Sequence, residues 1–522
     1  MRSILSLCLF SVCCAPVVAA DIHVPGDFAT IQAAVNAASD GDRILISPGM
    51  YAERVTAPLN ISIELIGVDG PSVTILDARG APGQGPALEL IGGEDLVKGL
   101  TIRGDEGKQS GLNFSGAGIF KSSGSITIVD CVIEECELTN SPIIDFAEGA
   151  GARLTSLSSL VIRDTVFRNN GPSFKGGAIS AFASTTELIG CRFENNSATS
   201  GGAVWFTSIN MIQSCDFVGN HATDSGGALF GGDIARIQDS VFDSNTSDGG
   251  MGAINGSLSQ IFNCIFSNNI ANGEGGAIGQ GLSPDAFRVD SSLFYNNSAA
   301  SGSCIDSRTP IEINNSILWN NGPSTINADG AIVVRFSIVE GGFPGDGNFD
   351  ADPMFVDPIS GDFNLATGSP AIDAGNNALL PRDLEDLNNN GIITDGYPFD
   401  MVGNPRHTQD LFVPDTGVAD LLSFPLDLGP LERVVSAPTD GFADCNGNFI
   451  NDLLDILGDA ETDLNENLIP DSCDIASGVL SDDDGNGIPD EYETCTADLN
   501  GDGVLNFFDV SVFLSAYQAG CP

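Results

Sequence analysis

The sequence is poor in basic residues and in histidine. Its 522 residues include 20 Lys and Arg against 70 Asp and Glu, a formal net charge of −50. Such a polyanion repels phosphate backbones, which argues against a nucleic-acid partner and favours metal cations. The three histidines, His23, His221 and His407, are too far apart in the sequence to suggest a metal site or a catalytic pair, so we expect structural roles for them.

Long apolar runs are also missing, except at the N-terminus. Residues 1–20 carry Arg2, an apolar stretch Ile4–Val12 and the small-residue pattern Val18-Ala19-Ala20 before Asp21. This pattern is typical of a secretory signal peptide, and it predicts a secreted, extracellular or cell-surface protein. No later run of about 18 apolar residues occurs, so no transmembrane helix is expected after the signal. Disulfides are permitted in such a location.

What the sequence does contain is a repeat of about 25 residues. Each copy has an aliphatic residue, then a small residue (Cys, Ser or Thr) three positions later and usually Phe two positions after that, and Asn follows three residues after the Phe. The phenylalanines are Phe167, Phe193, Phe217, Phe242, Phe266 and Phe294. The asparagines are Asn170, Asn196, Asn220, Asn245, Asn269, Asn297 and Asn321. Pairs such as Gly201-Gly202 and Gly226-Gly227 then mark a sharp corner.

These short β-branched or aromatic segments, interrupted by Asn and Gly, predict about three strands per repeat. Stacked copies would form parallel sheets, with an interior Phe stack and a ladder of Asn side chains bonded to one another. We expect the Asn residues to adopt the left-handed backbone conformation of a turn. Cys191, Cys215 and Cys264 share their position with Ser240 and with other Ser or Thr residues, which indicates small buried ladder residues rather than metal ligands.

The FxxN and GGA[IVL] repeats resemble those of polymorphic membrane proteins and other pectate-lyase-like proteins. That resemblance implies an all-β fold, a right-handed parallel β-helix over residues 21–435. The opening, Ile22-His23-Val24-Pro25 through Pro48-Gly49-Met50-Tyr51, resembles an N-terminal cap with a helix at about Thr30–Ala38. The stretches Asp352–Phe355 and Ser369–Gly375 resemble the last coils of secreted bacterial members, and Gly403–Arg406 and Asp427–Glu432 their terminal motif.

The acidic tail, residues 436–494, contains three loops with oxygen-bearing side chains at alternate positions and a closing Asp four residues later. This spacing suits calcium and resembles thrombospondin type 3 repeats. The predicted ligands are Asp444, Asn446, Asn448 and Asp452; Asp463, Asn465, Asn467 and Asp471; and Asp482, Asp484, Asn486 and Asp490. A solvated acidic linker is the alternative interpretation. A further candidate loop runs from Asp386 to Asp395.

Residues 495–522 contain one more loop, whose ligand order is that of an EF-hand. Its predicted calcium ligands are Asp498, Asn500, Asp502, the backbone of Val504, Asn506 and Asp509. With the apolar stripe that follows, this loop resembles one half of a dockerin module, which would imply a cohesin-like partner. Two disulfides, Cys445–Cys473 and Cys495–Cys521, are favoured as staples for this region.

Catalytic motifs of pectinases are not found in the sequence. Asp130 and Asp164 occupy equivalent positions on successive coils, with Arg163 and Arg192 near the same face, so these four are the weak candidates for acid–base chemistry. The alternative interpretation is that these four side chains are solvated residues on the strand exterior without a catalytic role. Trp205 and Trp319 stand alone in the sequence, and packing explains them more simply than sugar stacking does.

The leading functional hypothesis is a non-enzymatic exported surface or matrix protein, an adhesin-like or polysaccharide-binding rod that needs calcium for its tail. A polysaccharide lyase or glycoside hydrolase acting on the β-helix face is the rival, and a dockerin-bearing component of an extracellular complex is the third hypothesis.

Overall fold

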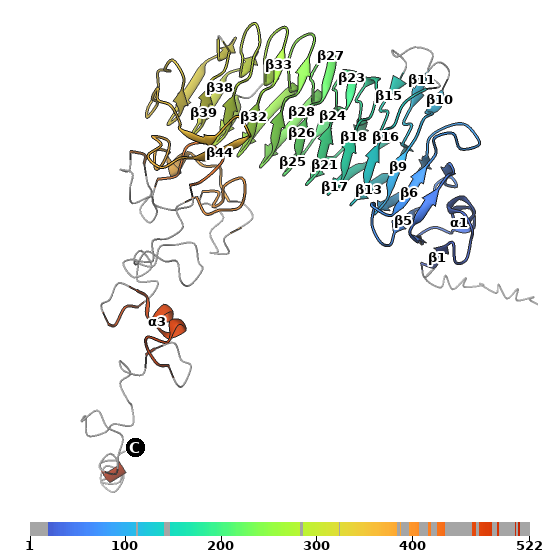
Figure 1. Ribbon diagram of the computed structural model, residues 1–522, viewed down its shortest axis with the longest axis horizontal. Helices are drawn as coiled ribbons and strands as arrows, with labels where there is room; N and C mark the ends of the chain where they lie inside the picture. Colours follow the sequence, from blue (N-terminus) through green and yellow to red (C-terminus); the bar gives the residue numbers. More distant parts are fainter. Residues whose placement is uncertain are drawn as a thin grey trace, which may run out of the picture.

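A computed structural model of the chain describes residues 19–110, 113–139, 147–281, 286–322, 324–383, 387, 396–406, 416–418, 425–433, 462–465, 469–482, 488–489, 507 and 510–511. Over residues 21–339 the chain winds as a stack of coils whose strands pair in parallel, apart from one antiparallel pair within residues 108–115 (Figure 1). Each full coil passes from sheet B to sheet C, then through the first and second halves of sheet A. The predicted solenoid is confirmed.

The three sheets are named by their strands. Sheet B consists of β3 (Gly49–Tyr51), β6 (Thr74–Asp77), β9 (Thr101–Arg103), β14 (Val132–Glu134), β18 (Val166–Arg168), β22 (Arg192–Glu194), β26 (Asp216–Val218), β29 (Val241–Asp243), β32 (Ile265–Ser267), β36 (Leu293–Tyr295), β39 (Ile317–Trp319) and β42 (Ile338–Val339). Sheet C consists of β10 (Lys108–Ser110), β11 (Asn113–Ser115), β15 (Ala147–Glu148), β19 (Ser173–Lys175), β23 (Ser197–Ser200), β27 (His221–Ser225), β30 (Thr246–Ser247) and β33 (Ile270–Ala271).

Sheet A is the widest. Its first half holds β4 (Val55–Thr56), β7 (Leu88–Ile91), β12 (Ile119–Ser122), β16 (Ala152–Leu157), β20 (Ile179–Ala183), β24 (Val204–Ile209), β34 (Ile278–Gln280), β37 (Ile305–Ser307) and β40 (Ile326–Ala328). Its second half holds β1 (Asp21–Val24), β2 (Asp42–Ile46), β5 (Ile63–Gly67), β8 (Glu94–Lys98), β13 (Ser125–Val129), β17 (Ser159–Arg163), β21 (Thr186–Ile189), β25 (Met211–Gln213), β35 (Phe287–Asp290), β38 (Ile311–Asn314) and β41 (Ile332–Arg335). The long strands β28 (Leu229–Gln238) and β31 (Ile254–Phe262) span both halves.

The interior Phe stack forms as predicted. Phe217 is fully buried and lies between Phe193 and Phe242, with ring centroids 4.7 Å away on each side and planes within about 5° of parallel. The spacing equals the distance between neighbouring strands, because each ring occupies the same position one coil later. These residues form the centre of a core that runs along the solenoid axis.

The asparagine ladder is confirmed, with one correction. The Asn220 side-chain amide donates to Asn245 Oδ1 at 3.0 Å and to the carbonyl of Phe193 at 2.9 Å. The prediction that these asparagines are left-handed is wrong: the preceding residue has that conformation, as at Asn169 (φ 56°) and Asn195 (φ 53°). The ladder residue must instead point inward, because its amide satisfies buried backbone groups of the turn.

The Gly-Gly corner connects sheet C to sheet A. Gly201 has φ +66°, a conformation that L side chains rarely adopt. A Cβ at Gly202 would lie 2.1 Å from the carbonyl oxygen of Gly227 in the next coil. The pair is therefore required by both backbone conformation and close stacking.

Helix α1 (Ile31–Ala37) packs against β1, β2 and β4, as predicted for a cap. Thr30 is its N-cap and accepts a hydrogen bond from the amide of Ala33 at 3.1 Å. Beyond the solenoid, the structure describes a 3-10 helix η2 (Asn377–Leu379), a hairpin of β43 (Phe355–Asp357) and β44 (Asp362–Leu365), and helix α3 (Asp471–Ser477). Within the described parts of the chain, no helix is both long and apolar enough to cross a membrane.

The segments expected to form the last coils behave differently. Residues 353–383, 396–406 and 425–433, here called the strap, fold back along the outside of the solenoid (Figure 1). Strands β43 and β44 pair with each other in antiparallel fashion, so they do not continue the parallel stack. The strap covers an apolar part of the outer face of sheet B, which explains why it folds back over the solenoid. The apolar outward-facing residues in this part of sheet B include Ile265, Leu293, Ile317 and Ile338. They pack against Phe363, Leu365 and Ile372 of the strap.

Candidate functional site

The four weak catalytic candidates lie on the solenoid exterior but do not form one site. Asp130 (φ 50°) and Asp164 (φ 48°) are exposed turn residues between sheets A and B. The same left-handed position holds Ser214 and Asn263 in later coils, so a short polar side chain is needed there for backbone reasons.

The two arginines belong to different sheets. Arg163 ends β17 of sheet A and lies 3.7 Å from Glu187, whereas Arg192 on β22 of sheet B lies 2.5 Å from Glu194 and 2.6 Å from Asp216. No ion pair among the described residues joins either arginine to Asp130 or Asp164. The four side chains therefore show no convergence on one substrate position.

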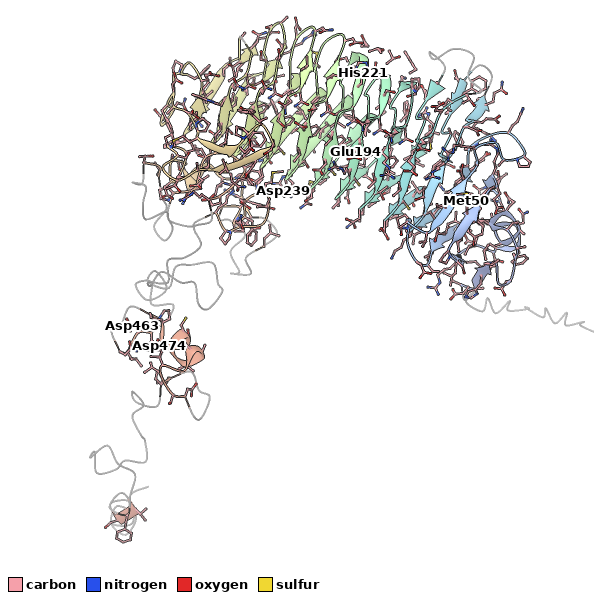
Figure 2. All side chains as sticks on the ribbon, in the orientation of Figure 1. Met50, Glu194, His221, Asp239, Asp463 and Asp474 are labelled. Carbon is pink, nitrogen blue, oxygen red and sulfur yellow. The ribbon has the colours of Figure 1, made fainter. Side chains whose placement is uncertain are left out.

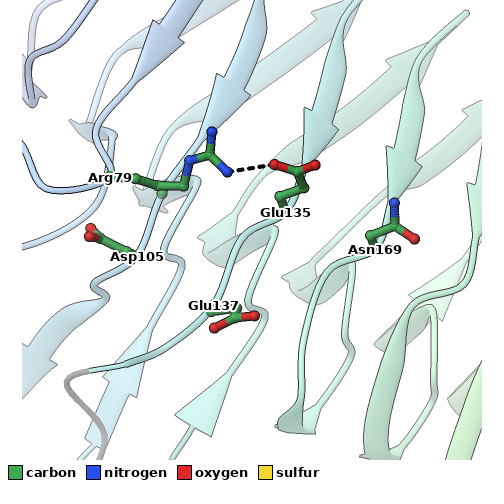
Figure 3. A pocket seen from close by; sticks show the side chains of 6 residues that line it. Arg79, Asp105, Glu135, Glu137 and Asn169 are labelled. Atoms are coloured by element: carbon green, nitrogen blue, oxygen red, sulfur yellow. Dashed lines mark hydrogen bonds and ion pairs between the residues drawn. The ribbon is translucent and has the colours of Figure 1, made fainter.

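A depression of about 510 Å³ lies at the turns between sheets B and C near the N-terminal end of the solenoid (Figure 3). It is lined by Arg79, Gly104, Asp105, Glu135, Glu137 and Asn169. Arg79 lies 2.5 Å from Glu135, and Arg54 lies 2.7 Å from Asp105, so these charges already neutralise each other. Of its charged lining residues, Arg79, Asp105 and Glu135 are held in ion pairs, and the lining holds no histidine, serine or cysteine.

A different feature lies on the outer side of sheet A. Half-buried aromatic side chains point outward from its first half, next to the Gly-Gly corner; together with two cations they are called the aromatic strip here. Its members are Phe120, Arg153, Lys175, Phe182, Trp205 and Phe230. Strand pairing places Phe120 beside Arg153, and Trp205 beside Phe230 one coil further on.

The rings and cations of the aromatic strip contact one another. The ring centroids of Phe182 and Trp205 are 4.7 Å apart. Arg153 lies 4.3 Å above Phe182, and Lys175 lies 4.4 Å above Trp205. These distances are those of cation–π contacts.

One carboxylate holds both cations. Glu148 lies 2.7 Å from Arg153 and 3.5 Å from Lys175. Burial lowers the pKa of Arg153 from its ordinary value, and Glu148 opposes this effect. Two cations against one carboxylate make the strip locally positive, on a protein whose formal net charge is −50.

The two tryptophans therefore differ in role. Trp319 packs against the apolar cluster under the strap, as predicted from packing. Trp205 is not isolated, because Phe182 and Lys175 contact it on the outer face. Aligning the Gly-Gly-Ala repeats would have found the strip, since Trp205 and Phe230 both stand two residues after the alanine of their repeat.

The predicted small-residue ladder is confirmed. Cys215 is buried, and its amide donates to Ser240 Oγ at 3.1 Å. Burial raises the pKa of Cys264 far above that of a free thiol, so this thiol is unreactive. His221 Nδ1 lies 3.0 Å from Thr246 Oγ1, and its Nε2 lies 3.5 Å from Asp248, consistent with a structural role.

Only part of the predicted calcium tail is described. Asp463, Asn465 and Asp471 of the second loop, and Asp482 of the third, are placed; Asn467, Asp484, Asn486 and Asp490, the first loop, the EF-hand-like loop and most of the Asp386–Asp395 loop lie outside the described residues. Residues 1–18 of the predicted signal peptide also lie outside them.

Hydrogen bonds join the second loop to helix α3. Both carboxylate oxygens of Asp471 accept from the amide of Leu464, at 3.0 and 3.1 Å, and Asn465 donates to Asp474 at 2.7 Å. Figure 2 shows Asp463 beside helix α3, which contains Asp474. Among the described residues, no group of three or more His, Cys, Asp or Glu side chains is placed to hold a metal ion. Cys473 is disulfide-bonded, and its expected partner Cys445 is not among the described residues.

Comparisons with known proteins concern the fold. The family model described as right handed beta helix region matches residues 90–282, which agrees with the predicted fold class, a right-handed parallel β-helix. The crystal structure of pectate lyase Pel9A is similar over 80% of this chain and 96% of its own, with 14% identity and a TM-score of 0.38. A mutant of the PL6 family alginate lyase AlyGC is similar over 67% of this chain and 55% of its own, with 13% identity and a TM-score of 0.28. No curated protein matches the chain in sequence.

Proposed function

We propose that this protein is an exported, non-enzymatic β-helix rod that binds polysaccharide along the aromatic strip. The strip is the single observation that carries the proposal. Half-buried aromatic rings on the outer face of a sheet have no packing role toward the core. Arg153 and Lys175 each cover one face of Phe182 and Trp205, so the strip offers a ligand these cation–π pairs together with the rings of Phe120 and Phe230. A sugar ring has an apolar face and hydroxyl groups around its edge. It is bound well by an aromatic ring that has polar or charged side chains beside it.

A linear, repetitive ligand fits the repetition of the strip. Outward side chains at equivalent positions recur once per coil, at the strand spacing of about 4.8 Å. Phe120, Arg153, Trp205 and Phe230 follow this column across five coils, with Ser180 between Arg153 and Trp205. A polymer lying along the solenoid axis would therefore meet one side chain of this column per coil, and three of these five side chains are aromatic.

Binding is favoured over lyase or hydrolase chemistry by the charges at the strip. General acid–base catalysis by carboxylates needs two groups within reach of one bond. Of the described residues, two carboxylates adjoin the strip: Glu148, which is held between Arg153 and Lys175, and Glu89, which lies beside Phe120 in the strand register and pairs with Lys108. Both carboxylates are therefore engaged in ion pairs with the protein's own cations.

The test is binding to a panel of neutral, acidic and sulfated polysaccharides, with Trp205→Ala compared with Met211→Ala. Met211 also points outward from the same coil, but it lies on the second half of sheet A. We expect Trp205→Ala to lose affinity by about tenfold or more, as when a central aromatic contact is removed, and Met211→Ala to bind as the wild type does. No binding to any polymer, or equal binding by Trp205→Ala, would refute the proposal. New reducing ends or unsaturated products would support the enzymatic alternative instead.

The acidic tail is proposed to bind calcium. Asp463, Asn465 and Asp471 offer oxygen donors, the chemistry that calcium prefers, and the Asp471 carboxylate is fully buried against the loop. These residues would hold the ion, which would supply the positive charge that the loop lacks. The proposal includes export of the protein. Extracellular calcium-binding modules have dissociation constants of about 0.1–1 mM, so they need the high calcium concentration found outside the cell.

A further inference from the structure

The strap is joined to the solenoid through one buried guanidinium. Arg406 is 0% exposed; its Nη2 donates to Asn263 Oδ1 on the solenoid and to the carbonyl of Gly429 at 3.3 Å, and its Nε donates to the carbonyl of Phe399 at 3.1 Å. The guanidinium also lies over the ring of Phe262. Arg406 therefore connects three segments of the chain that are far apart in the sequence.

Carboxylates outnumber cations around this guanidinium. Glu432 Oε2 faces Arg406 Nη1 at 3.5 Å, and both atoms lack a hydrogen-bond partner in the structure. Asp427, which is 1% exposed, accepts the amides of Asp373 at 2.8 Å and Arg433 at 2.7 Å. The chain of contacts continues from the amide of Asp427 to Glu432 Oε1 at 3.0 Å, and from the amide of Glu432 to Asp400 at 2.9 Å.

A second group of acids lies where the strap crosses the edge of the solenoid. Asp239 accepts from Asn263 at 3.0 Å and lies 3.5 Å from the hydroxyl of Tyr397. Asp290 is 0% exposed and pairs with Arg288, which donates to the strap carbonyl of Leu379 at 2.6 Å. Asp239 lies at the opposite edge of the coils from His221 (Figure 2).

Other ionisable and polar groups also face these acids. Near Asp427 lie Asp373, Asp400 and Arg433. Near Asp239 lie Arg236 and Arg406. Asp290 accepts hydrogen bonds from Gln260 and Asn314. Asn314 also contacts Glu312, which pairs with Arg335. The nearby arginines compensate the acids only in part, because Arg288 is engaged by Asp290 and Arg406 is shared among Asp239, Asp427 and Glu432.

Burial moves the titration of these acids toward neutrality. It raises the pKa of Asp427 to about 7, against the two backbone amides that favour the anion. It raises the pKa of Glu432 well above its usual range, helped by the neighbouring Asp427. The pKa values of Asp239 and Asp290 are each raised to about 6, again by burial and against their Arg and Asn partners.

We propose that the strap is a pH-dependent clamp, docked firmly in mild acid and held less firmly at neutral pH, where buried carboxylates around Arg406 must lose their protons. Release would expose an apolar surface on sheet B, formed by Val241, Ile265, Leu293, Ile317, Ile338 and Trp319. This inference does not depend on the aromatic strip, which lies on sheet A.

The direction follows from proton linkage. An acid whose pKa is higher in the docked state than in the undocked state binds its proton more tightly there, so docking is strongest at low pH. That contribution is lost as the pH rises from about 4, near the ordinary value, to about 7, the value for docked Asp427. Within this window, each such carboxyl weakens docking by up to about tenfold per pH unit.

The experiment uses Trp319 as the reporter. The chain has two tryptophans, so Trp205→Phe leaves Trp319, in the cluster under the strap, as the one emitter. In this background we expect Trp319 emission to shift to the red, and amide exchange at residues 396–406 to increase, between pH 4.5 and pH 7.5. Far-UV circular dichroism should show that the solenoid remains folded.

Two added variants identify the groups responsible. Asp427→Asn with Glu432→Gln should reduce the pH dependence to the share that Asp239 and Asp290 contribute, because both replaced side chains are then neutral at every pH. Asp216→Asn, on the part of sheet B outside the strap contacts, should leave the dependence unchanged. Amide exchange of the wild-type chain gives an independent readout if the double variant does not fold. A pH-independent strap in the wild type, or an unchanged pH dependence in the folded double variant, would overturn the proposal.

Discussion

Lys121 is a charged residue inside the solenoid. Its side chain is 0% exposed and forms an ion pair with Asp95, whose side chain is 1% exposed. The ammonium also donates to the carbonyls of Gly92 and Gly93, and Asp95 accepts from the amide of Ile63 at 3.0 Å. All these groups lie in the early coils, on β5, β8 and β12 and in the turn between β7 and β8.

Replacing Lys121 by methionine keeps most of the side-chain volume and removes the charge. The change leaves the Asp95 carboxylate buried without its cation, which typically costs about 3–5 kcal/mol. The double variant Lys121→Met with Asp95→Leu removes both charges, and it is expected to regain most of this loss. Removing one partner of the Lys121–Asp95 ion pair is thus predicted to destabilise the protein strongly, whereas replacing both partners by apolar residues is predicted to change its stability little.

The pH dependence of Lys121→Met is also predicted. Burial already raises the pKa of Asp95, while Lys121 opposes the rise. Without Lys121 the pKa must rise further, so the variant recovers stability as the pH falls and Asp95 takes up a proton. The stability deficit at pH 4.5 should be clearly smaller than at pH 7.

Chemical denaturation at both pH values, with amide exchange of residues 94–98 and 119–122, measures these effects. A decrease of less than about 1 kcal/mol in the free energy of unfolding of Lys121→Met at pH 7 would refute the reasoning, because an unpaired buried charge destabilises a protein by more than this. A double variant no more stable than the single one would refute it as well.

Three further predictions concern the ladder, the corner and the tail. Asn196→Ala should lower the free energy of unfolding by at least about 3 kcal/mol, because loss of its hydrogen bonds with Asn220, Asn170 and the carbonyl of Phe167 leaves buried groups unpaired. Asn195→Gly should lower it by less than about 1 kcal/mol, since the same left-handed position is Gly219 one coil later. Gly202→Ala should lower stability by about 1–3 kcal/mol, whereas Gly250→Ala, whose added Cβ would meet nothing closer than 3.9 Å, should be nearly neutral in the same assay. Asp471→Asn should weaken calcium binding of the full chain by about tenfold or more in titration calorimetry, and calcium chelation should increase amide exchange at residues 471–477 of the wild type.

The repeats allowed the solenoid to be predicted, because stacking places equal residues at equal positions. Phe193, Phe217 and Phe242 had to be stacked once the coils were aligned, and their parallel rings confirm it. The left-handed residue of the turn was assigned one position too late. Asn195 and Asn196 are chemically identical, but one coil later Gly219 stands at the first of these two positions and Asn220 at the second, which marks the first as the left-handed position.

The strap was misassigned because its motifs were interpreted by resemblance rather than from the surface they cover. The outward column of sheet B changes from Arg192 and Asp216 to Val241 and Ile265 in the middle of the solenoid. An apolar column on an exterior face requires a cover, so the change could have predicted the strap.

The aromatic strip was missed for a related reason. Trp205 was considered as a single residue, although its neighbours on the strip come from adjacent coils and become visible only in register. Distances such as those from Glu148 to Arg153 and Lys175 depend on side-chain placement across the corner, which repeat spacing does not specify.

The asparagine ladder tolerates coils of unequal length. Successive ladder bonds join residues 24, 25, 26 or 28 positions apart, and one turn bond spans 34 positions. The extra residues of the 34-residue coil lie between β14 and β15, and those of the 28-residue coil between β34 and β35, so they leave the column in register. Because each coil contacts only its neighbours, a damaged coil should fray locally while distant ones persist, and the molecule could lengthen by duplicating one repeat.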